Sequence, residues 1–151
     1  MTDAAFKVDR IDHVEFFVPD RHQAADWYDA VLGLKILSEC EHWAANPSGP
    51  LMISSDGGRT KLALFQGQPQ NARKTAGFHR VAFVVDAGNF ERFLGQLQRL
   101  NLTDDDGHVV TRDDVKDHAG AYSIYFSDPY GHRLELTTYD YARAGELLRR
   151  R

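Results

Sequence analysis

The sequence lacks the features that mark several classes of protein. It contains one cysteine, Cys40, so an intramolecular disulfide is excluded. No apolar run approaches the ~20 residues of a membrane-spanning helix, and residues 1–10 lack the apolar stretch of a signal peptide. We therefore expect a cytoplasmic protein that does not enter a membrane.

An excess of basic charge is also missing. The chain has 18 Lys and Arg against 22 Asp and Glu, a formal net charge of −4. Nucleic-acid binding needs a basic face to neutralise phosphates, so we expect no nucleic-acid partner. Phosphate-binding glycine motifs, Cys-x-x-Cys pairs and the Gly-x-Ser-x-Gly elbow are absent as well. A chain of 151 residues is long enough for a real core, and we predict a single domain over 1–151.

What the sequence does contain is an internal repeat. Each half reads as a strand, a helix opened by an aspartate, and three extended segments. The first half places these strands at 11–18, 34–44, 50–55 and 60–65, and the second at 78–85, 107–112, 121–126 and 132–138. Cys40 falls in an alternating segment and is interpreted as a small buried hydrophobic residue.

The repeat aligns residue by residue at its end, where 56–64 lies over 128–136 with matching acid, basic residue and leucines. We predict an α+β fold of two tandem βαβββ modules. Module one covers about 9–66 and module two about 78–138, with a linker at about 67–77 and a C-terminal helix or tail at 139–151.

Side chains alternate along a strand, which predicts two faces for the sheet. Val14, Phe16 and Val18 form the apolar set that a helix covers, which leaves His13, Glu15 and Phe17 on the opposite face. In the last strand the same argument leaves Glu135 on that face. We expect the modules to form a curved mixed sheet around a cleft, where a histidine and a carboxylate are potential metal ligands.

The opening His13 strand and the closing stretch 125–135, Tyr-Phe-Ser-Asp-Pro-Tyr-Gly-His-Arg-Leu-Glu, resemble the vicinal-oxygen-chelate superfamily of glyoxalases, bleomycin resistance proteins and ring-cleaving dioxygenases. The resemblance covers roughly 9–140 and implies a glyoxalase/dioxygenase-like fold. It also implies a divalent metal held from the first and last strands of both modules. The corresponding positions here are His13, Ala63, Arg80 and Glu135. Ala63 cannot ligate, but similar family members use only two His and one Glu.

Arg80 is the departure that matters, because the ligand position of module two falls on it rather than on His79. Three arrangements are open. A bulge or register shift turns His79 inward to complete a His13–His79–Glu135 site. Alternatively, Glu15 supplements a weaker site. In the third, Arg80 points inward, where its cation repels a metal and pairs with Glu135 or an anionic substrate.

A second group supports the dioxygenase branch. His118 precedes Tyr125 by seven residues, and extradiol enzymes similar to this stretch place a His and a Tyr beside the metal. Histidine is a suitable acid–base group near neutral pH, and a tyrosine hydroxyl can donate a hydrogen bond to a developing anion. Phe17 and Trp43 are candidate aromatic walls of the substrate site.

Our leading hypothesis is a small metal-dependent enzyme most like a ring-cleaving, extradiol-type dioxygenase, with Fe(II) or another divalent ion. The alternative is a metal-free protein that binds or sequesters small molecules, with Arg80 as the anion-binding group. The third hypothesis is a glyoxalase- or thiol-transferase-type enzyme. We expect a small aromatic or anionic substrate, and the resemblance implies a homodimer.

Overall fold

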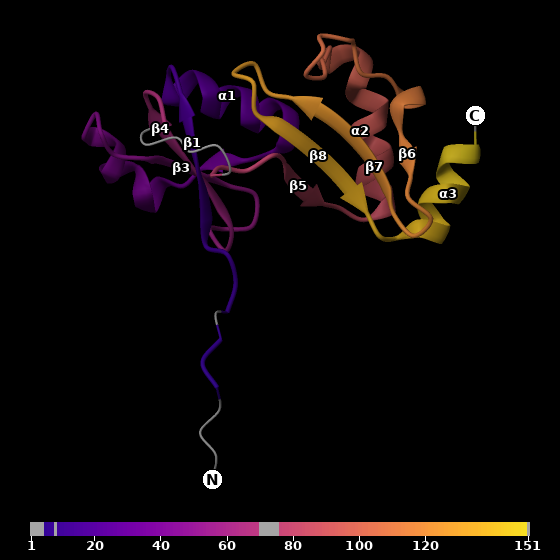
Figure 1. Cartoon of the computed structure of the whole chain (residues 1–151), viewed down its shortest axis with the longest axis horizontal. Helices are drawn as coiled ribbons and strands as arrows, with labels where there is room; N and C mark the ends of the chain where they lie inside the picture. The colour runs from indigo at the N-terminus through magenta and orange to yellow at the C-terminus, as the bar shows by residue number, and fades with distance from the viewer. Residues whose placement is uncertain (1–4, 8, 70–75, 151) are drawn as a thin grey trace. The chain divides into compact units, whose positions relative to one another are not determined.

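The computed structural model describes residues 5–7, 9–69 and 76–150. The chain divides into two compact units, unit 1 (residues 1–72) and unit 2 (residues 73–151), which are described separately (Figure 1). Among the described residues no helix is both long and apolar enough to cross a membrane. The elements in chain order are β1 (His13–Val18), α1 (Arg21–Leu32), β2 (Lys35–Ile36), the 3₁₀ helix η1 (Ser38–Ala45), β3 (Leu51–Ser54), β4 (Lys61–Gln66), β5 (Val81–Val84), α2 (Ala87–Leu100), the 3₁₀ helix η2 (Arg112–Asp114), β6 (Lys116–Asp117), β7 (Tyr122–Ser127), β8 (Arg133–Thr138) and α3 (Tyr141–Arg149).

Each unit contains one four-stranded mixed sheet, and the two sheets have the same topology. The strand order is β1-β4-β3-β2 in unit 1 and β5-β8-β7-β6 in unit 2. The first strand of each unit runs parallel to its last strand, and the other neighbours are antiparallel. The predicted α+β fold of two βαβββ modules is therefore confirmed. The curved sheet around a shared cleft stays a prediction.

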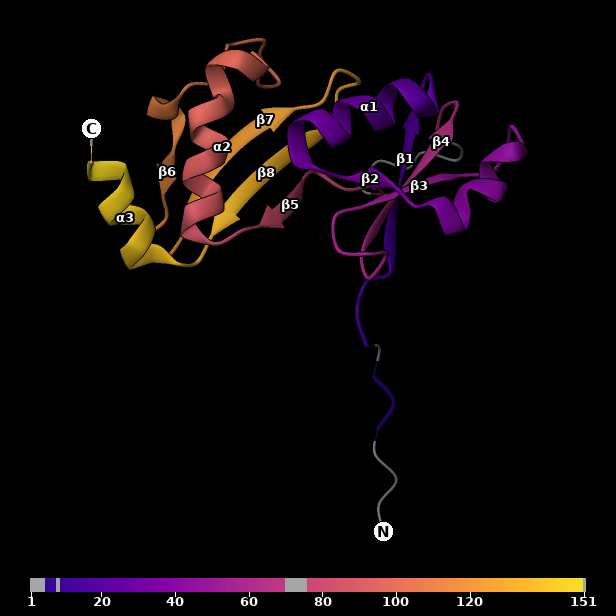
Figure 2. The same ribbon diagram turned by 180° about the vertical axis from the view of Figure 1, so that it is seen from behind.

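One helix covers one face of each sheet, as the apolar pattern predicts (Figure 2). The side chain of Asp20 caps α1 by accepting from the backbone N–H of Gln23, and Gly33 ends the helix at φ 68°. Below α1, the rings of Phe16 and Tyr28 meet edge to face with centroids 6.1 Å apart. The core of unit 1 therefore lies between α1 and the even-numbered residues of β1.

Two predicted strands are wrong. Over 34–44 only β2 is extended, and the chain then turns into η1, where Cys40 is half-buried rather than fully buried. The apolar residues Leu37, Cys40 and Trp43 recur every third residue, which suits a 3₁₀ helix rather than a strand, and the Cys40 N–H bonds back to the carbonyl of Leu37. Residues 107–112 likewise contribute one isolated bridge, Thr103 to Val109, and the edge strand β6 follows later.

Arg21, at the start of α1, binds the end of η1 and the turn that follows it. Its side chain is 8% exposed, and its guanidinium donates to the backbone carbonyls of Ala44 (3.0 Å), Asn46 (3.2 Å) and Gly49 (2.6 Å). These bonds satisfy a buried charge with three carbonyl dipoles, which is how an unpaired cation becomes tolerable inside a protein. Arg21 therefore fixes the segment that carries Trp43.

Replacing Arg21 with methionine is expected to lower the free energy of unfolding by about 3 kcal/mol, because it removes three part-buried hydrogen bonds that a charged group donates to backbone carbonyls. Urea unfolding monitored by tryptophan fluorescence measures the change. The matched control is Arg92→Met on the exposed face of α2, for which we expect less than about 0.5 kcal/mol. Equal changes in the free energy of unfolding in the two variants would show that the Arg21 hydrogen bonds do not stabilise the fold.

Candidate functional site

The face of the unit 1 sheet opposite α1 carries the residues predicted for the cleft. Burial alternates along β1: Phe16 and Val18 are at most 1% exposed, whereas His13 and Glu15 are exposed. Across β1 and β4, Glu15 is the register partner of Ala63, so the two share this face. The alternation predicted for β1 is thus confirmed within unit 1.

His13 is oriented by the residue before it. Its Nδ1 lies 2.8 Å from the Asp12 carboxylate, and the same carboxylate accepts a 2.9 Å bond from Lys61 Nζ. The hydrogen bond with His13, followed by that from Lys61, holds the pKa of Asp12 below its ordinary value. A histidine bonded at Nδ1 presents Nε2 as its free ligand atom, and Nε2 is 3.7 Å from the carboxylate of Glu15.

Apolar side chains fill the middle of this face. Ala63 lies in a buried cluster with Leu37 and Met52, against which Cys40 and Phe65 pack. Ala63 therefore acts as a small core residue at a position where the family resemblance places a ligand. The ring centroids of Phe17 and Phe65 lie 5.9 Å apart. Trp43, on η1, remains 45% exposed.

In unit 2 the face opposite α2 carries a row of cross-strand neighbours. Glu135 of β8 is the register partner of both Tyr125 on β7 and Ala82 on β5. Glu135 is half-buried, and its carboxylate has no hydrogen bond or ion pair within the part of the chain that the structure describes. A half-buried carboxylate without a partner favours binding of a cation.

Arg80, just before β5, reaches this same face. Its guanidinium carbon lies 4.5 Å from the centroid of the Tyr125 ring, and Tyr125 shares the face with Glu135. The Nε of Arg80 is buried and has no hydrogen-bond partner among the described residues. The geometry therefore favours the third of the three open arrangements, in which Arg80 occupies this face of unit 2.

His79 is held elsewhere. It is exposed, and both ring nitrogens lie near Arg133 Nη1, at 3.1 and 3.2 Å. The β5–β8 register runs unbroken from Val81 to Val84, so no bulge in this strand redirects the chain. A guanidinium beside the imidazole opposes the approach of a metal cation to His79.

His118 and Tyr125, which were predicted to act together, are in contact. His118 Nε2 lies 2.8 Å from the Tyr125 hydroxyl oxygen, and the two rings meet edge to face. Because Arg80 covers the ring whose hydroxyl bonds His118, the three side chains form a continuous group within unit 2. Such a group can bind an anion through Arg80 and move a proton through the tyrosine–histidine pair.

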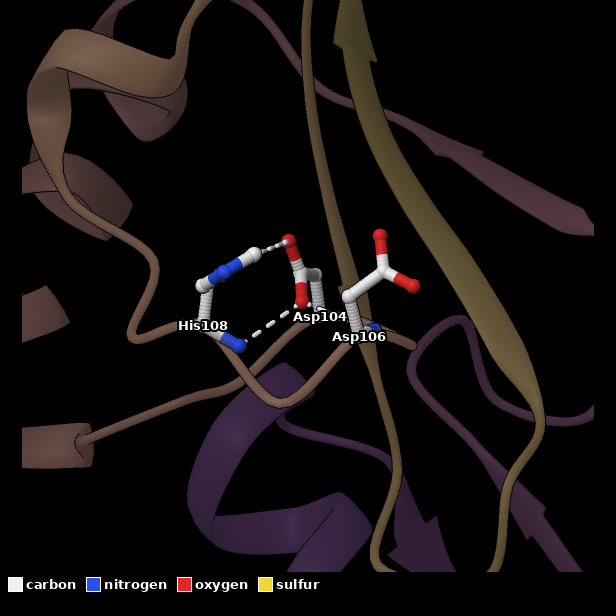
Figure 3. Close-up of side chains that lie close together, drawn as sticks. All are labelled: Asp104, Asp106 and His108. Atoms are coloured by element: carbon white, nitrogen blue, oxygen red, sulfur yellow. Dashed lines mark hydrogen bonds and ion pairs between the residues drawn. The ribbon is translucent and has the colours of Figure 1, made fainter.

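The structure also brings together Asp104, Asp106 and His108, which were not predicted as a group (Figure 3). Their potential ligand atoms all lie within 4.8 Å of one another. However, Asp104 Oδ1 accepts the backbone N–H of Asp106 and of His108, each at 2.9 Å. The bond from the His108 backbone is the main cause of the lowered pKa of Asp104. These are the bonds that close an exposed turn, and the acid-rich run 104–106 followed by Gly107 is its sequence signal.

Comparison with curated proteins identifies relatives that align over most of both chains. The chain is 31% identical over 131 residues to the metallothiol transferase FosB of Staphylococcus saprophyticus. The aligned region covers 87% of this chain and 78% of the relative. The corresponding protein of Lysinibacillus sphaericus is 28% identical, with 87% of this chain and 83% of the relative covered.

Solved structures with the same fold include oxidase ChaP-H2, with a TM-score of 0.61 and 21% identity over 87% of this chain and 94% of that one. The fosfomycin resistance protein FosX of Mesorhizobium loti gives a TM-score of 0.55 and 20% identity over 87% and 93%. The family model for the Glyoxalase/Bleomycin resistance protein/Dioxygenase superfamily matches residues 10–136. The chain belongs to this superfamily.

Proposed function

We propose that the protein is a divalent-metal-dependent enzyme that transfers a group to a small anionic substrate. The evidence for an anionic substrate is the state of Arg80. Its guanidinium is stacked on Tyr125, and its buried Nε has no partner among the described residues. The group-transfer chemistry is supported by the relatives, which are named metallothiol transferases. A ring-cleaving dioxygenase is the second candidate, supported by the contact between His118 and Tyr125.

Two side chains, those of His13 and Glu135, have donor atoms that suit a divalent ion. His13 presents Nε2 because Asp12 occupies Nδ1, and the Glu135 carboxylate has no partner among the described residues. We propose both side chains as metal ligands, each on the sheet face opposite the helix of its own unit. Arg80 stands where a third ligand is expected, so we expect a site with more positions open to substrate and water than a three-ligand site has. A bound divalent ion would supply Lewis-acid polarisation of the substrate oxygens.

The protein's own groups then have separate tasks. Arg80 binds an anionic oxygen of the substrate by charge-assisted hydrogen bonds and orients it. Tyr125 donates a proton or a hydrogen bond to an oxygen on which negative charge develops, and His118 restores that proton. Phe17 and Trp43 offer aromatic surface for an apolar part of the substrate. Glu15, 3.7 Å from His13, remains a proposed contact for substrate or metal.

The proposal is tested with the full-length protein loaded with Mn(II) or with Fe(II). Each form is assayed with a low-molecular-weight thiol plus fosfomycin, and separately with catechols under air, with products identified by mass spectrometry. We expect a thiol adduct that forms only with metal present. Ring-cleaved catechol without an adduct would support the dioxygenase instead. Tight binding of the anionic compound without turnover or metal would support the metal-free binding protein.

A further inference from the structure

The loop that carries His118 has an unusual backbone. Ala119 adopts φ 58°, the left-handed region that residues with a side chain rarely occupy. The carboxylate of Asp117 accepts the Ala119 N–H at 2.8 Å, and the His118 N–H bonds to the carbonyl of Ala121 at 2.9 Å. The direction of the His118 side chain therefore depends on a turn that Asp117 holds closed.

Asp117 is in turn held by the C-terminal helix. The Tyr141 hydroxyl, in the first turn of α3, donates to both carboxylate oxygens of Asp117, at 2.8 and 3.0 Å. The hydrogen bond to Asp117 raises the pKa of Tyr141 to about 12, because the carboxylate stabilises the protonated hydroxyl. Both views of the ribbon show α3 beside β6, the strand that ends at Asp117 (Figures 1 and 2).

The ring of Tyr141 is fixed independently of its hydroxyl. It stacks on Tyr122 with centroids 4.7 Å apart and planes 13° apart, and Tyr122 is the register partner of Asp117 across β6 and β7. Gly145, one helical turn further along α3, lies against the Tyr122 hydroxyl, where an added Cβ would approach to 3.2 Å. Tyr141 thus contacts both members of one cross-strand pair, Tyr122 with its ring and Asp117 with its hydroxyl.

We propose that Tyr141 and Asp117 are positioning residues that hold His118 against Tyr125. The C-terminal helix α3 thereby contributes to the geometry of the site through Tyr141. The contacts form an unbroken series: Tyr141 to Asp117, Asp117 to the Ala119 turn, and His118 to the Tyr125 hydroxyl. The catalytic consequence rests on the proposed function, but the positioning of His118 does not.

The decisive variant is Tyr141→Phe, which removes the hydroxyl and keeps the ring on Tyr122. The readout is the ¹⁵N chemical shifts of the His118 imidazole by NMR, which report the hydrogen bond at Nε2 without any assay of activity. We expect the His118 signals to move toward those of a free imidazole. The control is Tyr139→Phe, because Tyr139 is 72% exposed and should leave these signals unchanged.

Substitutions of Asp117 complete the test. Asp117→Ala should shift the His118 signals further, whereas Asp117→Asn keeps an oxygen for the Ala119 N–H and should restore them. In an active enzyme, Tyr141→Phe should lower kcat roughly tenfold with little change in KM, since small misplacements of an acid–base group are costly. Wild-type His118 shifts in both Tyr141→Phe and Asp117→Ala would overturn the positioning role. Shifted signals in a protein that is inactive in every assay would retain it and reject only the proposed function. If Tyr141→Phe does not fold, Asp117→Ala at the exposed edge strand decides the question.

Discussion

Replacing His13 with alanine is expected to remove the bound divalent metal from the purified protein. The imidazole is a proposed ligand, and two of its described neighbours cannot replace it, because Asp12 is engaged by Lys61 and Ala63 is a buried apolar residue. Glu15, 3.7 Å away, then remains as a single carboxylate, which is too weak to hold the ion alone. Glu135→Gln should have the same effect, because an amide oxygen is a far weaker donor to a divalent ion than a carboxylate. Elemental analysis of protein prepared without chelators or an affinity tag, together with titration calorimetry using Mn(II), measures both losses.

Two further variants make this test specific. His22→Ala removes an exposed histidine from α1 and should leave the metal content unchanged. Asp12→Asn keeps the ligand but weakens the acceptor that orients it, for which we expect metal affinity to fall roughly 10–100-fold. Retention of full metal content in both His13→Ala and Glu135→Gln would reject the proposed ligands. The exposed group at Asp104, Asp106 and His108 would then be the next cluster to mutate.

The repeat itself was predictable because its signals are local and periodic. Alternation with period two separated Phe16 and Val18 from His13 and Glu15, and the aspartates at 20 and 86 marked the start of each long helix. The same rule failed at η1, where Leu37, Cys40 and Trp43 recur every third residue and the buried Arg21 binds backbone carbonyls at the end of η1 and just after it. Arg21 is distant in sequence from those carbonyls, so local periodicity carries no signal of this contact.

The candidate site was predictable only in part for a similar reason. The sequence could place Arg80 at a ligand position, but only the structure shows its guanidinium on the ring of Tyr125. Tyr141 and Asp117 are 24 residues apart in the sequence, and no motif predicts their contact. Residue types and spacing therefore indicate which chemistry is available, while side-chain packing decides which groups meet.

Replacing Arg80 with histidine is expected to strengthen binding of a divalent metal by at least about tenfold, equivalent to ~1.4 kcal/mol. The substitution removes a cation from the face that carries Glu135 and places an imidazole, a good ligand for many divalent metals, at the third position. Affinity for an anionic substrate should fall at the same time, because the charged donor is lost. Calorimetric titration with Mn(II), and separately with the anionic compound, measures the two opposite changes.

Arg80→Met is the matched control, since it removes the charge and offers no comparable donor. If relief of repulsion alone strengthens metal binding, Arg80→Met and Arg80→His will gain equally, and position 80 is then no ligand position. A gain confined to Arg80→His, and retained when His79→Ala is added, would show that position 80 can complete the metal site and that His79 takes no part. In that case the natural arginine exchanges metal affinity for recognition of an anion. That exchange would distinguish this chain from family members with a third ligand.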